Sequence, residues 1–252
     1  SRMGYPYSIK PGRYKIVKGM SNKKLITILR AGLQTPTRIT FTGFRTPQQL
    51  AGRISAQLEA DSADLVAAFA NKELVAEYGF TTETFIAMFI PNTYEFFWNT
   101  GAKGFFDRMK REYDAFWNET RSKKAADMGM DRIEVSTLAS IVEEETRADE
   151  ERPKVARVIY NRLDKGMRLQ MDSTLQYALQ KYGQRMLETD LQTDSPYNTY
   201  LNTGLPPGPI CSPGAASLRA ALRPETGKWI FFVSNADGRT HTFSVTEEEH
   251  LK

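Results

Sequence analysis

The chain has 252 residues, of which 40% are hydrophobic and 25% are charged, and its formal net charge is +4. Length and composition predict a globular protein of one large domain, or of a large domain with a small satellite, and they exclude a disordered chain. Acidic and basic residues alternate without a long Lys/Arg tract, which excludes an extended nucleic-acid-binding patch.

The first part of the chain predicts a small unit followed by helices. Residues 13–17 alternate like a short strand, and Ser21 is placed to cap a helix. A second strand is expected over residues 38–42. Pro47 is typical of the first position of a helix, and a longer amphipathic helix is expected over residues 103–121.

The second half predicts further helices and a terminal hairpin. Asp131–Glu134 has the spacing of a capping box for a helix that contains Glu145, and residues 151–166 predict the next helix. Ser173–Gln176 repeats the capping-box spacing, and residues 229–245 are typical of a β-hairpin. Helices mixed with peripheral strands predict an α+β fold.

Glu145 is the candidate catalytic residue on the residues alone. Leu138, Ile141 and Val142 precede it at helical spacing, which places all four side chains on one stripe of an α-helix. A carboxyl group on an apolar stripe loses solvation, so its pKa is expected to rise and it can serve as a general acid. Residues 143–144 are expected to point away, and their replacement by Gln to be mild. The alternative is a structural core carboxylate paired with an arginine.

Amide, hydroxyl and aromatic side chains gather in loops stiffened by Gly and Pro, which is typical of a groove that binds sugars. These loops lie within Tyr160–Tyr177, Tyr197–Gly208 and Pro91–Tyr94. Each has a structural alternative as helix caps, a strand or turns. The sequence has no glycine-rich nucleotide motif, and one cysteine with two histidines disfavours a zinc site, so neither a cofactor nor a metal is expected.

Several longer strings occur in a fixed order along the second half of the chain. They are Leu138–Thr146, Val155–Leu163, Met167–Gln170, Tyr197–Tyr200, Thr203–Gly208 and Ser212–Ala215. Together they resemble the MltG/YceG-like endolytic murein transglycosylases, over roughly residues 85–245. The family's catalytic glutamate directly precedes a Thr or a small residue, which corresponds to Glu145 before Thr146.

The resemblance implies a lysozyme-like α+β catalytic domain over residues 37–252. It implies a LysM-like module before it, of which residues 1–36 are the latter part. In full-length members a single inner-membrane helix lies outside the region matched here, and the catalytic domain is periplasmic. Two segments depart from the family: Thr42–Phe44 replaces a Val-Glu-Gly-like segment, and Asn92 stands where members have Asp, so no role is assigned to Asn92.

The resemblance further implies non-hydrolytic cleavage of the MurNAc-β-1,4-GlcNAc bond within peptidoglycan strands, which would set strand length during cell wall synthesis. Glu145 would act first as acid and then as base, and the MurNAc 6-hydroxyl would close onto C1 to leave 1,6-anhydro-MurNAc ends. The residues expected to bind substrate are Asn161, Gln170, Asp172, Thr174, Tyr177, Tyr197, Asn198, Thr199 and Tyr200.

Other expected contacts follow from the same reaction. Arg162 or Arg168 is expected to hold a carboxylate of the substrate, and His241 is expected to be structural. The expected partners are peptidoglycan glycan strands and cell wall synthases, with no nucleic acid bound and the protein a monomer.

Two other functions stay open at this stage. A hydrolytic muramidase would use water and a second carboxylate such as Asp172 or Glu151. A peptidoglycan-binding scaffold that recruits synthases would keep the groove without turnover. The intact Glu145–Thr146 pair favours an enzyme over such a scaffold.

Overall fold

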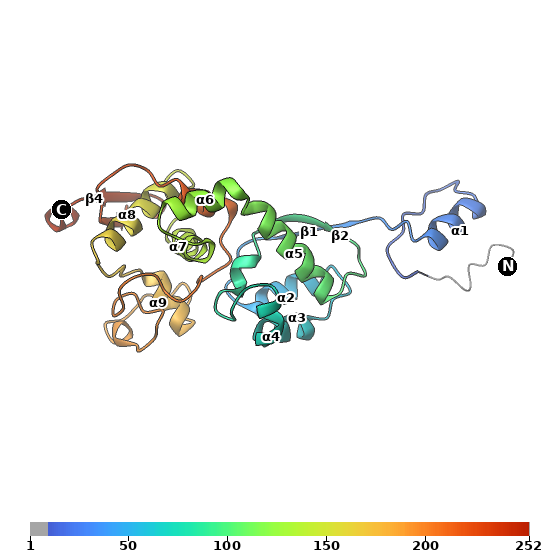
Figure 1. The fold of residues 1–252 in the computed structure, drawn as a ribbon, viewed down its shortest axis with the longest axis horizontal. Helices are drawn as coiled ribbons and strands as arrows, with labels where there is room; N and C mark the ends of the chain where they lie inside the picture. The colour runs from blue at the N-terminus through green and yellow to red at the C-terminus, as the bar shows by residue number, and fades with distance from the viewer. Residues whose placement is uncertain (1–9, 252) are drawn as a thin grey trace.

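The computed structural model describes residues 10–251 as an elongated molecule with a two-lobed body and a separate N-terminal segment (Figure 1). This segment holds helix α1, Asn22–Ala31, whose first turn is capped by the Ser21 side chain as predicted. Helix α1 contains no buried residue and lies away from the body. The first nine residues of the expected LysM-like module lie outside the described residues.

The strand predicted over residues 13–17 is wrong. This stretch carries no strand assignment, and its Arg13 carbonyl accepts a single bond from the Thr35 backbone N–H (2.8 Å). Alternating side chains form a strand only where another segment supplies a ladder of backbone partners, and no segment within residues 10–251 does so here.

The first lobe is built on a two-stranded antiparallel sheet whose strands are far apart in sequence. Strand β1, Thr37–Phe41, pairs with β2, Asn92–Phe96, in a register that places Ile39 opposite Tyr94. The intervening chain forms helices α2, Pro47–Ser55; α3, Ser62–Ala70; α4, Lys72–Glu77; and the 3-10 helix η2, Phe85–Met88.

The helix predicted over residues 103–121 is two helices. Helix α5, Ala102–Phe116, stops before the buried Trp117, and α6, Glu119–Asp127, begins after Asn118. The Asn118 side chain accepts the backbone N–H of Arg121 (3.0 Å). An Asn in that geometry satisfies the first turn of a new helix, so it interrupts a pattern that is amphipathic on both sides.

The second lobe is organised around helix α7, Arg132–Glu145, which starts at the predicted capping box (Figure 1). It packs against α6, α8, α9, α10 and the first-lobe helix η2. The remaining elements of this lobe are α8, Arg152–Asp164; α9, Asp172–Leu179; η3, Asp190–Gln192; α10, Ala215–Leu222; β3, Phe231–Ser234; β4, His241–Ser244; and α11, Glu247–His250.

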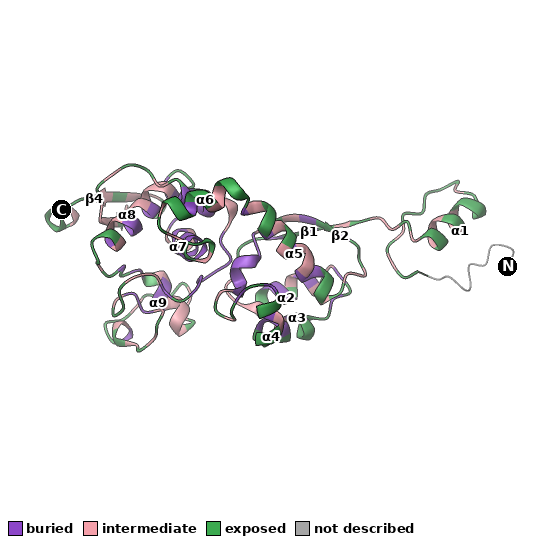
Figure 2. Cartoon of the chain, viewed as in Figure 1, coloured by how far each residue is buried: buried purple, intermediate pink, exposed green. Residues whose placement is uncertain are grey.

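Helix α7 is buried on every side rather than along one stripe. All residues from 135 to 142 are buried, including Ser136, Thr137 and Ser140 on the polar face (Figure 2). The hydroxyls of these residues donate to carbonyls three or four positions back, which satisfies them inside the core. The apolar stripe predicted from the sequence exists, but it does not separate a core face from a solvent face.

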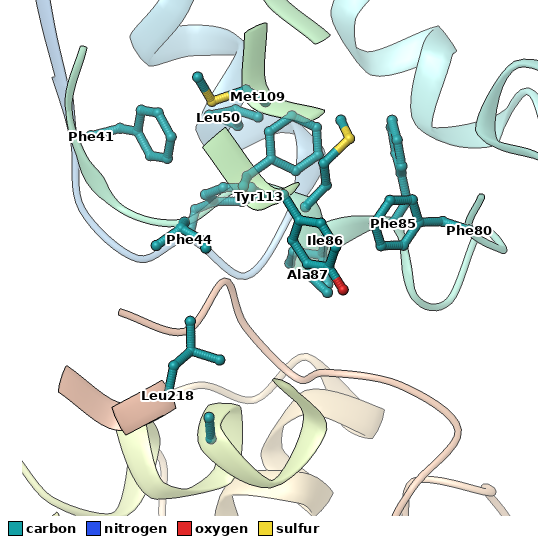
Figure 3. Packing of buried hydrophobic residues seen from close by; sticks show 14 of the residues in the cluster. Phe41, Phe44, Leu50, Phe80, Phe85, Ile86, Ala87, Met109, Tyr113 and Leu218 are labelled. Carbon is teal, nitrogen blue, oxygen red and sulfur yellow. The ribbon is translucent and has the colours of Figure 1, made fainter. Parts of the chain in front are cut away.

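Aromatic side chains fill the first lobe and meet the second. The Phe89 ring lies 5.1 Å from Phe69 and 5.2 Å from Phe85, centroid to centroid. Figure 3 shows the ring cluster of the first lobe facing Leu218 of α10. The buried side chains of the two lobes therefore form one continuous hydrophobic core.

The segment Ile210–Ser212 fastens the two lobes through its backbone. The Ile210 N–H donates to the Ser140 hydroxyl on α7 (2.9 Å), and the Ser212 N–H donates to the Phe44 carbonyl in the first lobe (2.8 Å). The Ser212 hydroxyl donates to the Phe89 carbonyl. These three buried hydrogen bonds connect α7 to the first lobe through the segment Ile210–Ser212.

The observed composition of helices with two small two-stranded sheets confirms the α+β prediction. The predicted helix over 151–166 and the terminal hairpin are also present, with β3 and β4 paired antiparallel. Between residues 10 and 251, no helix combines the length and apolarity required to cross a bilayer.

Removing the cap of α7 should lower global stability. Asp131→Ala deletes the side chain that accepts the N–H groups of Ile133 and Glu134, so unfolding free energy should fall by about 1 kcal/mol. Ser21→Ala removes the equivalent cap of α1, which contributes no buried residue, and should leave the urea midpoint of the body unchanged. Equal midpoints for Asp131→Ala and wild type would show that the cap does not matter.

Candidate functional site

Glu145 ends α7 with its carboxyl group against the first turn of α9. The Ser173 hydroxyl donates to Glu145 Oε1 (2.5 Å). Burial raises the pKa of Glu145 above the ordinary value of 4.5, and the negative charge of Asp172 raises it further. The hydroxyl and backbone N–H of Ser173 and the nearby His241 act in the opposite direction, but the net shift is upward, as predicted.

The sequence prediction that Ser173–Gln176 is a capping box is wrong. Helix α9 begins at Asp172, so Ser173 lies inside the first turn and makes no cap. The Gln176 amide instead bonds the Gln184 carbonyl and the Gly183 N–H. Starting the helix earlier than predicted frees the Ser173 hydroxyl for Glu145. No local sequence signal distinguishes these two uses of a serine.

Asp172 and Tyr200, both predicted site residues, meet beside Glu145. The Tyr200 hydroxyl donates to Asp172 Oδ1 (2.5 Å), and Asp172 itself is exposed. Burial and this contact raise the pKa of Tyr200, so it stays protonated and keeps donating. The pair carries a net negative charge close to the Glu145 carboxyl group.

Glu145 also borders a cavity of about 860 Å³. One wall is formed by the end of α7 and its connection to α8, residues 144–150. The other wall is the β3–β4 hairpin, with Ser234 and residues 237–241. The hairpin lies about 90 residues further along the chain than the α7–α8 connection. The cavity therefore exists only in the folded protein.

His241 lines this cavity and is held by Glu151 at the start of α8. Glu151 Oε1 accepts the His241 backbone N–H (2.8 Å), and Oε2 lies 2.7 Å from His241 Nδ1. Burial opposes ionisation of Glu151, but the bonds from His241 outweigh it and lower the pKa of this carboxyl group. The contact with Glu151 is consistent with the structural role predicted for His241, and its place on the cavity wall goes beyond that role.

Asn198, a predicted substrate-binding residue, makes its hydrogen bonds within the fold. It is fully buried, and its amide donates to the carbonyls of Leu191 (3.0 Å) and Thr193 (2.8 Å). Its Oδ1 accepts the Tyr200 N–H (3.0 Å). These bonds shape the loop that carries Tyr200, which gives Asn198 a structural role beside the substrate contact predicted from the sequence.

Thr174 and Thr199 are structural for the same reason. Their hydroxyls lie 2.8 Å apart in a buried pocket, where Thr174 donates to the Met171 carbonyl and Thr199 accepts the Met171 N–H. They join the start of α9 to the loop before Tyr200. This structural role stands beside the substrate contacts predicted for the two residues.

Asn161 and Arg162 hold α8 against the segment that precedes β3. The Asn161 amide donates to the carbonyls of Gly227 (3.1 Å) and Trp229 (2.8 Å). The Arg162 guanidinium is buried and donates to the carbonyls of Ile230 (2.6 Å) and Leu169 (2.5 Å). These bonds give both residues a structural role, and their predicted contacts with substrate stay predictions. Sequence position alone does not show that the acceptors are distant backbone carbonyls.

The remaining predicted residues lie on accessible parts of the second lobe. The Tyr177 and Tyr197 rings contact each other at 4.8 Å between centroids, and Tyr177 lines a smaller hollow of about 270 Å³. Gln170 is exposed and has a left-handed backbone with φ of 50°. A non-glycine residue in that conformation is uncommon and is often found at functional sites. In the first lobe, Asn92 begins β2, and its Oδ1 accepts the backbone N–H of the adjacent Thr93.

Glu143 does not point away from the protein, contrary to the helical-wheel expectation. It accepts bonds from the buried Arg152 (2.9 Å), from the Ser217 hydroxyl (2.6 Å) and from the Gly214 N–H (3.2 Å). The wheel predicts direction from the helix axis, but α10 covers that face of α7 as well.

Glu144 is likewise engaged, by Arg45 of the first lobe. Arg45 Nε donates to Glu144 Oε1 (3.0 Å), its Nη2 donates to Oε2, and its guanidinium lies 4.8 Å from the Tyr182 ring centroid. Arg45 also lines the smaller hollow beside Tyr177. This ion pair crosses between the lobes directly beside Glu145.

Comparisons with known proteins agree over nearly the whole chain. A model of the YceG-like family matches residues 2–252. A crystal structure of a yceG-like protein from Listeria monocytogenes has a TM-score of 0.76 at 31% identity, covering 99% of this chain and 87% of that chain.

Two curated relatives carry the name endolytic murein transglycosylase. The protein of Bacillus subtilis (strain 168) is 47% identical over 116 residues, which cover 46% of this chain and 32% of that protein. The protein of Streptococcus pneumoniae serotype 2 is 28% identical over 284 residues, covering 96% of this chain and 49% of that protein. The chain therefore spans at most about half the length of these relatives.

Replacing Glu143 should destabilise the protein, in contrast to the mild effect expected from the sequence. Glu143→Gln leaves the buried Arg152 with a weaker partner, at a cost of roughly 1–3 kcal/mol in unfolding free energy. Urea denaturation measures this change. Glu144→Gln, which affects a more exposed ion pair, should cost less; equal losses for the two variants would contradict the burial argument.

Glu145→Gln should be more stable than wild type at neutral pH. Because folding raises the Glu145 pKa above 4.5, its favourable contribution is complete below that pH and is lost as pH rises through the folded value. Glutamine never ionises and escapes this loss. Urea midpoints between about pH 4 and pH 8 should therefore diverge in favour of the variant as pH rises. A difference that is constant with pH, or that reverses, would contradict a raised pKa.

Proposed function

The chain belongs to the YceG-like family, and on that premise we propose that it is a lytic transglycosylase that cleaves peptidoglycan strands internally. The proposed target is the MurNAc-β-1,4-GlcNAc bond, and the proposed products end in 1,6-anhydro-MurNAc. Relatives named endolytic murein transglycosylase support this reading. The observation in this chain that carries it is Glu145, a carboxyl group with a raised pKa at the edge of a large cavity.

In the first step Glu145 acts as a general acid. Its raised pKa keeps a proton available closer to neutral pH than an ordinary glutamate does. The proton passes to the bridging oxygen, which leaves with GlcNAc, while positive charge develops on the MurNAc ring. The nearby negative charge of Asp172 favours that developing charge.

In the second step the ionised Glu145 acts as a general base. It accepts the proton of the MurNAc 6-hydroxyl, whose oxygen closes onto C1 to form the anhydro ring. The attacking group belongs to the same sugar, so proximity takes the place of a bound water. The bond from Ser173 and the N-terminus of α9 favour the ionised carboxylate at this stage.

The proposed groove includes predicted substrate-binding residues that are exposed or half-buried. These are Gln170, Asp172, Tyr177, Tyr197 and Tyr200. The aromatic rings offer flat faces for sugar rings, and Asp172 and Gln170 offer polar groups for hydroxyls and acetamides. Asn161, Thr174, Asn198 and Thr199 are left out, because their polar groups serve the fold.

A hydrolytic muramidase is the second candidate, and one observation favours it. Asp172 lies close enough to Glu145 to raise its pKa, so a second carboxylate is present at the site. Glu151, the other carboxylate considered from the sequence, has both oxygens engaged by His241. The hydrolytic alternative therefore rests on Asp172 alone.

We also propose the domain division implied by the sequence, with a partial LysM-like module over residues 1–36 and a lysozyme-like catalytic domain over 37–252. The lack of buried residues in α1 supports a boundary there, and an acidic residue ending a buried helix between two lobes supports the lysozyme-like description. Because peptidoglycan lies outside the cytoplasmic membrane, we place the catalytic domain there, with cell wall synthases as candidate partners.

The decisive experiment is to digest uncrosslinked peptidoglycan and weigh the fragments. Wild type should release fragments with anhydro ends, one water lighter than reducing ends. Glu145→Gln should lose at least about a hundredfold in rate, because it keeps the shape and cannot transfer a proton. Reducing ends from wild type would favour the muramidase, and near-normal turnover by Glu145→Gln would reject Glu145 as the acid.

A further inference from the structure

The Glu151–His241 contact is a largely buried hydrogen bond beside the cavity that the proposed reaction does not use. The two side chains are only 9–10% exposed, and Thr146, the neighbour of Glu145, also donates to Glu151 Oε2 (3.3 Å). The pair thus links the end of α7 to the hairpin wall. Both Glu145 and His241 border the same cavity.

The orientation of the His241 ring is fixed on three sides. Glu151 holds the backbone N–H and Nδ1 together, and the ring packs at 5.4 Å from Phe232 and 6.4 Å from Phe243, centroid to centroid. A ring held in this way cannot turn without breaking a buried bond. Nε2, the other ring nitrogen, has no hydrogen-bond partner among residues 10–251.

The carboxylate also determines which nitrogen carries the proton. An ionised Glu151 is an acceptor only, so Nδ1 must carry the hydrogen between them. In the neutral ring Nε2 then has a free lone pair and can only accept. His241 lines a polar cavity, and its Nδ1 is already bonded to Glu151. Its Nε2 can therefore serve as the acceptor for a hydrogen-bond donor of a ligand.

We propose that His241 is a substrate-binding residue whose Nε2 accepts a hydrogen bond from the glycan seated beside Glu145. The donor is a sugar hydroxyl or an acetamide N–H. Glu151 is the positioning residue that orients the ring. This inference rests on the proposed function for the identity of the ligand, and on the cavity geometry for the contact itself.

Two substitutions separate the substrate contact from the structural contact. In His241→Asn the amide nitrogen takes the place of Nδ1, so the bond to Glu151 survives and Nε2 is lost. In His241→Gln the side chain reaches the place of Nε2, so an acceptor survives and the bond to Glu151 is lost. If His241 contacts the substrate, His241→Asn should be the less active variant. If His241 is purely structural, His241→Gln should be the less active variant.

The test measures binding of uncrosslinked glycan in a Glu145→Gln background, where no turnover consumes the ligand. His241→Asn should weaken binding by about tenfold, the value of one hydrogen bond, with little change in thermal midpoint. His241→Gln should recover part of that loss although its midpoint is lower. The reverse order of affinities, or equal affinity for His241→Asn and the parent, would overturn the proposal.

The same substitutions in otherwise wild-type protein add a kinetic readout. His241→Asn should lower kcat/KM on uncrosslinked peptidoglycan by about tenfold. If wild type releases anhydro ends and His241→Asn matches its kcat/KM, the role of His241 fails and the proposed function stands. If wild type is inactive, the binding experiment still decides the role of His241.

The second histidine supplies a matched control. His250 on α11 stacks on Phe231 at 5.1 Å and does not line the cavity. His250→Asn should bind glycan as the parent does, and it leaves His241 as the only imidazole. Nitrogen-15 NMR of that variant, at a pH where the ring is neutral, should show the proton on Nδ1. A proton on Nε2 would contradict the assignment of Nε2 as acceptor.

Discussion

The complete burial of helix α7 is the constraint on which the site depends. Its residues 135–142 are enclosed by helices of its own lobe and by η2 of the first lobe. Close packing along the middle of the helix determines where its last turn, with Glu145, is placed. Glu145 therefore reaches the cavity from the end of a packed helix. Its carboxyl group contacts Ser173, which lies in the first turn of another helix, α9.

The environment of Glu145 holds two opposing influences. Burial and Asp172 favour the protonated acid, while Ser173 and the N-terminus of α9 favour the carboxylate. With burial alone, the Glu145 carboxyl group would stay protonated and could not act as a base. With the α9 contacts alone, it would be ionised at neutral pH and could not act as an acid. Under the proposed reaction one group must both give and take a proton, and a balance of this kind suits that requirement.

The sequence predicted what depends on neighbouring residues and missed what depends on distant ones. The caps of Ser21 and Asp131 and the terminal hairpin follow from local backbone chemistry, and they are present. The spacing of Ser173 predicts a helix cap, because a serine has the same side chain in a cap and in a contact with a distant group. Its partner is the Glu145 carboxylate, 28 residues earlier in the chain, and local sequence does not show it.

The same distinction explains why Glu143, Glu144 and Glu145 differ in role despite identical side chains. A helical wheel gives their directions, but not what lies there: Arg152 for the first, Arg45 for the second and a serine for the third. Two of the three carboxylates are neutralised by arginines and hold α10 and the first lobe in place. Among residues 10–251 no arginine or lysine pairs with Glu145, and burial together with the charge of Asp172 favours its protonated form. Its proposed role as an acid thus follows from the absence of a partner that its two neighbours have.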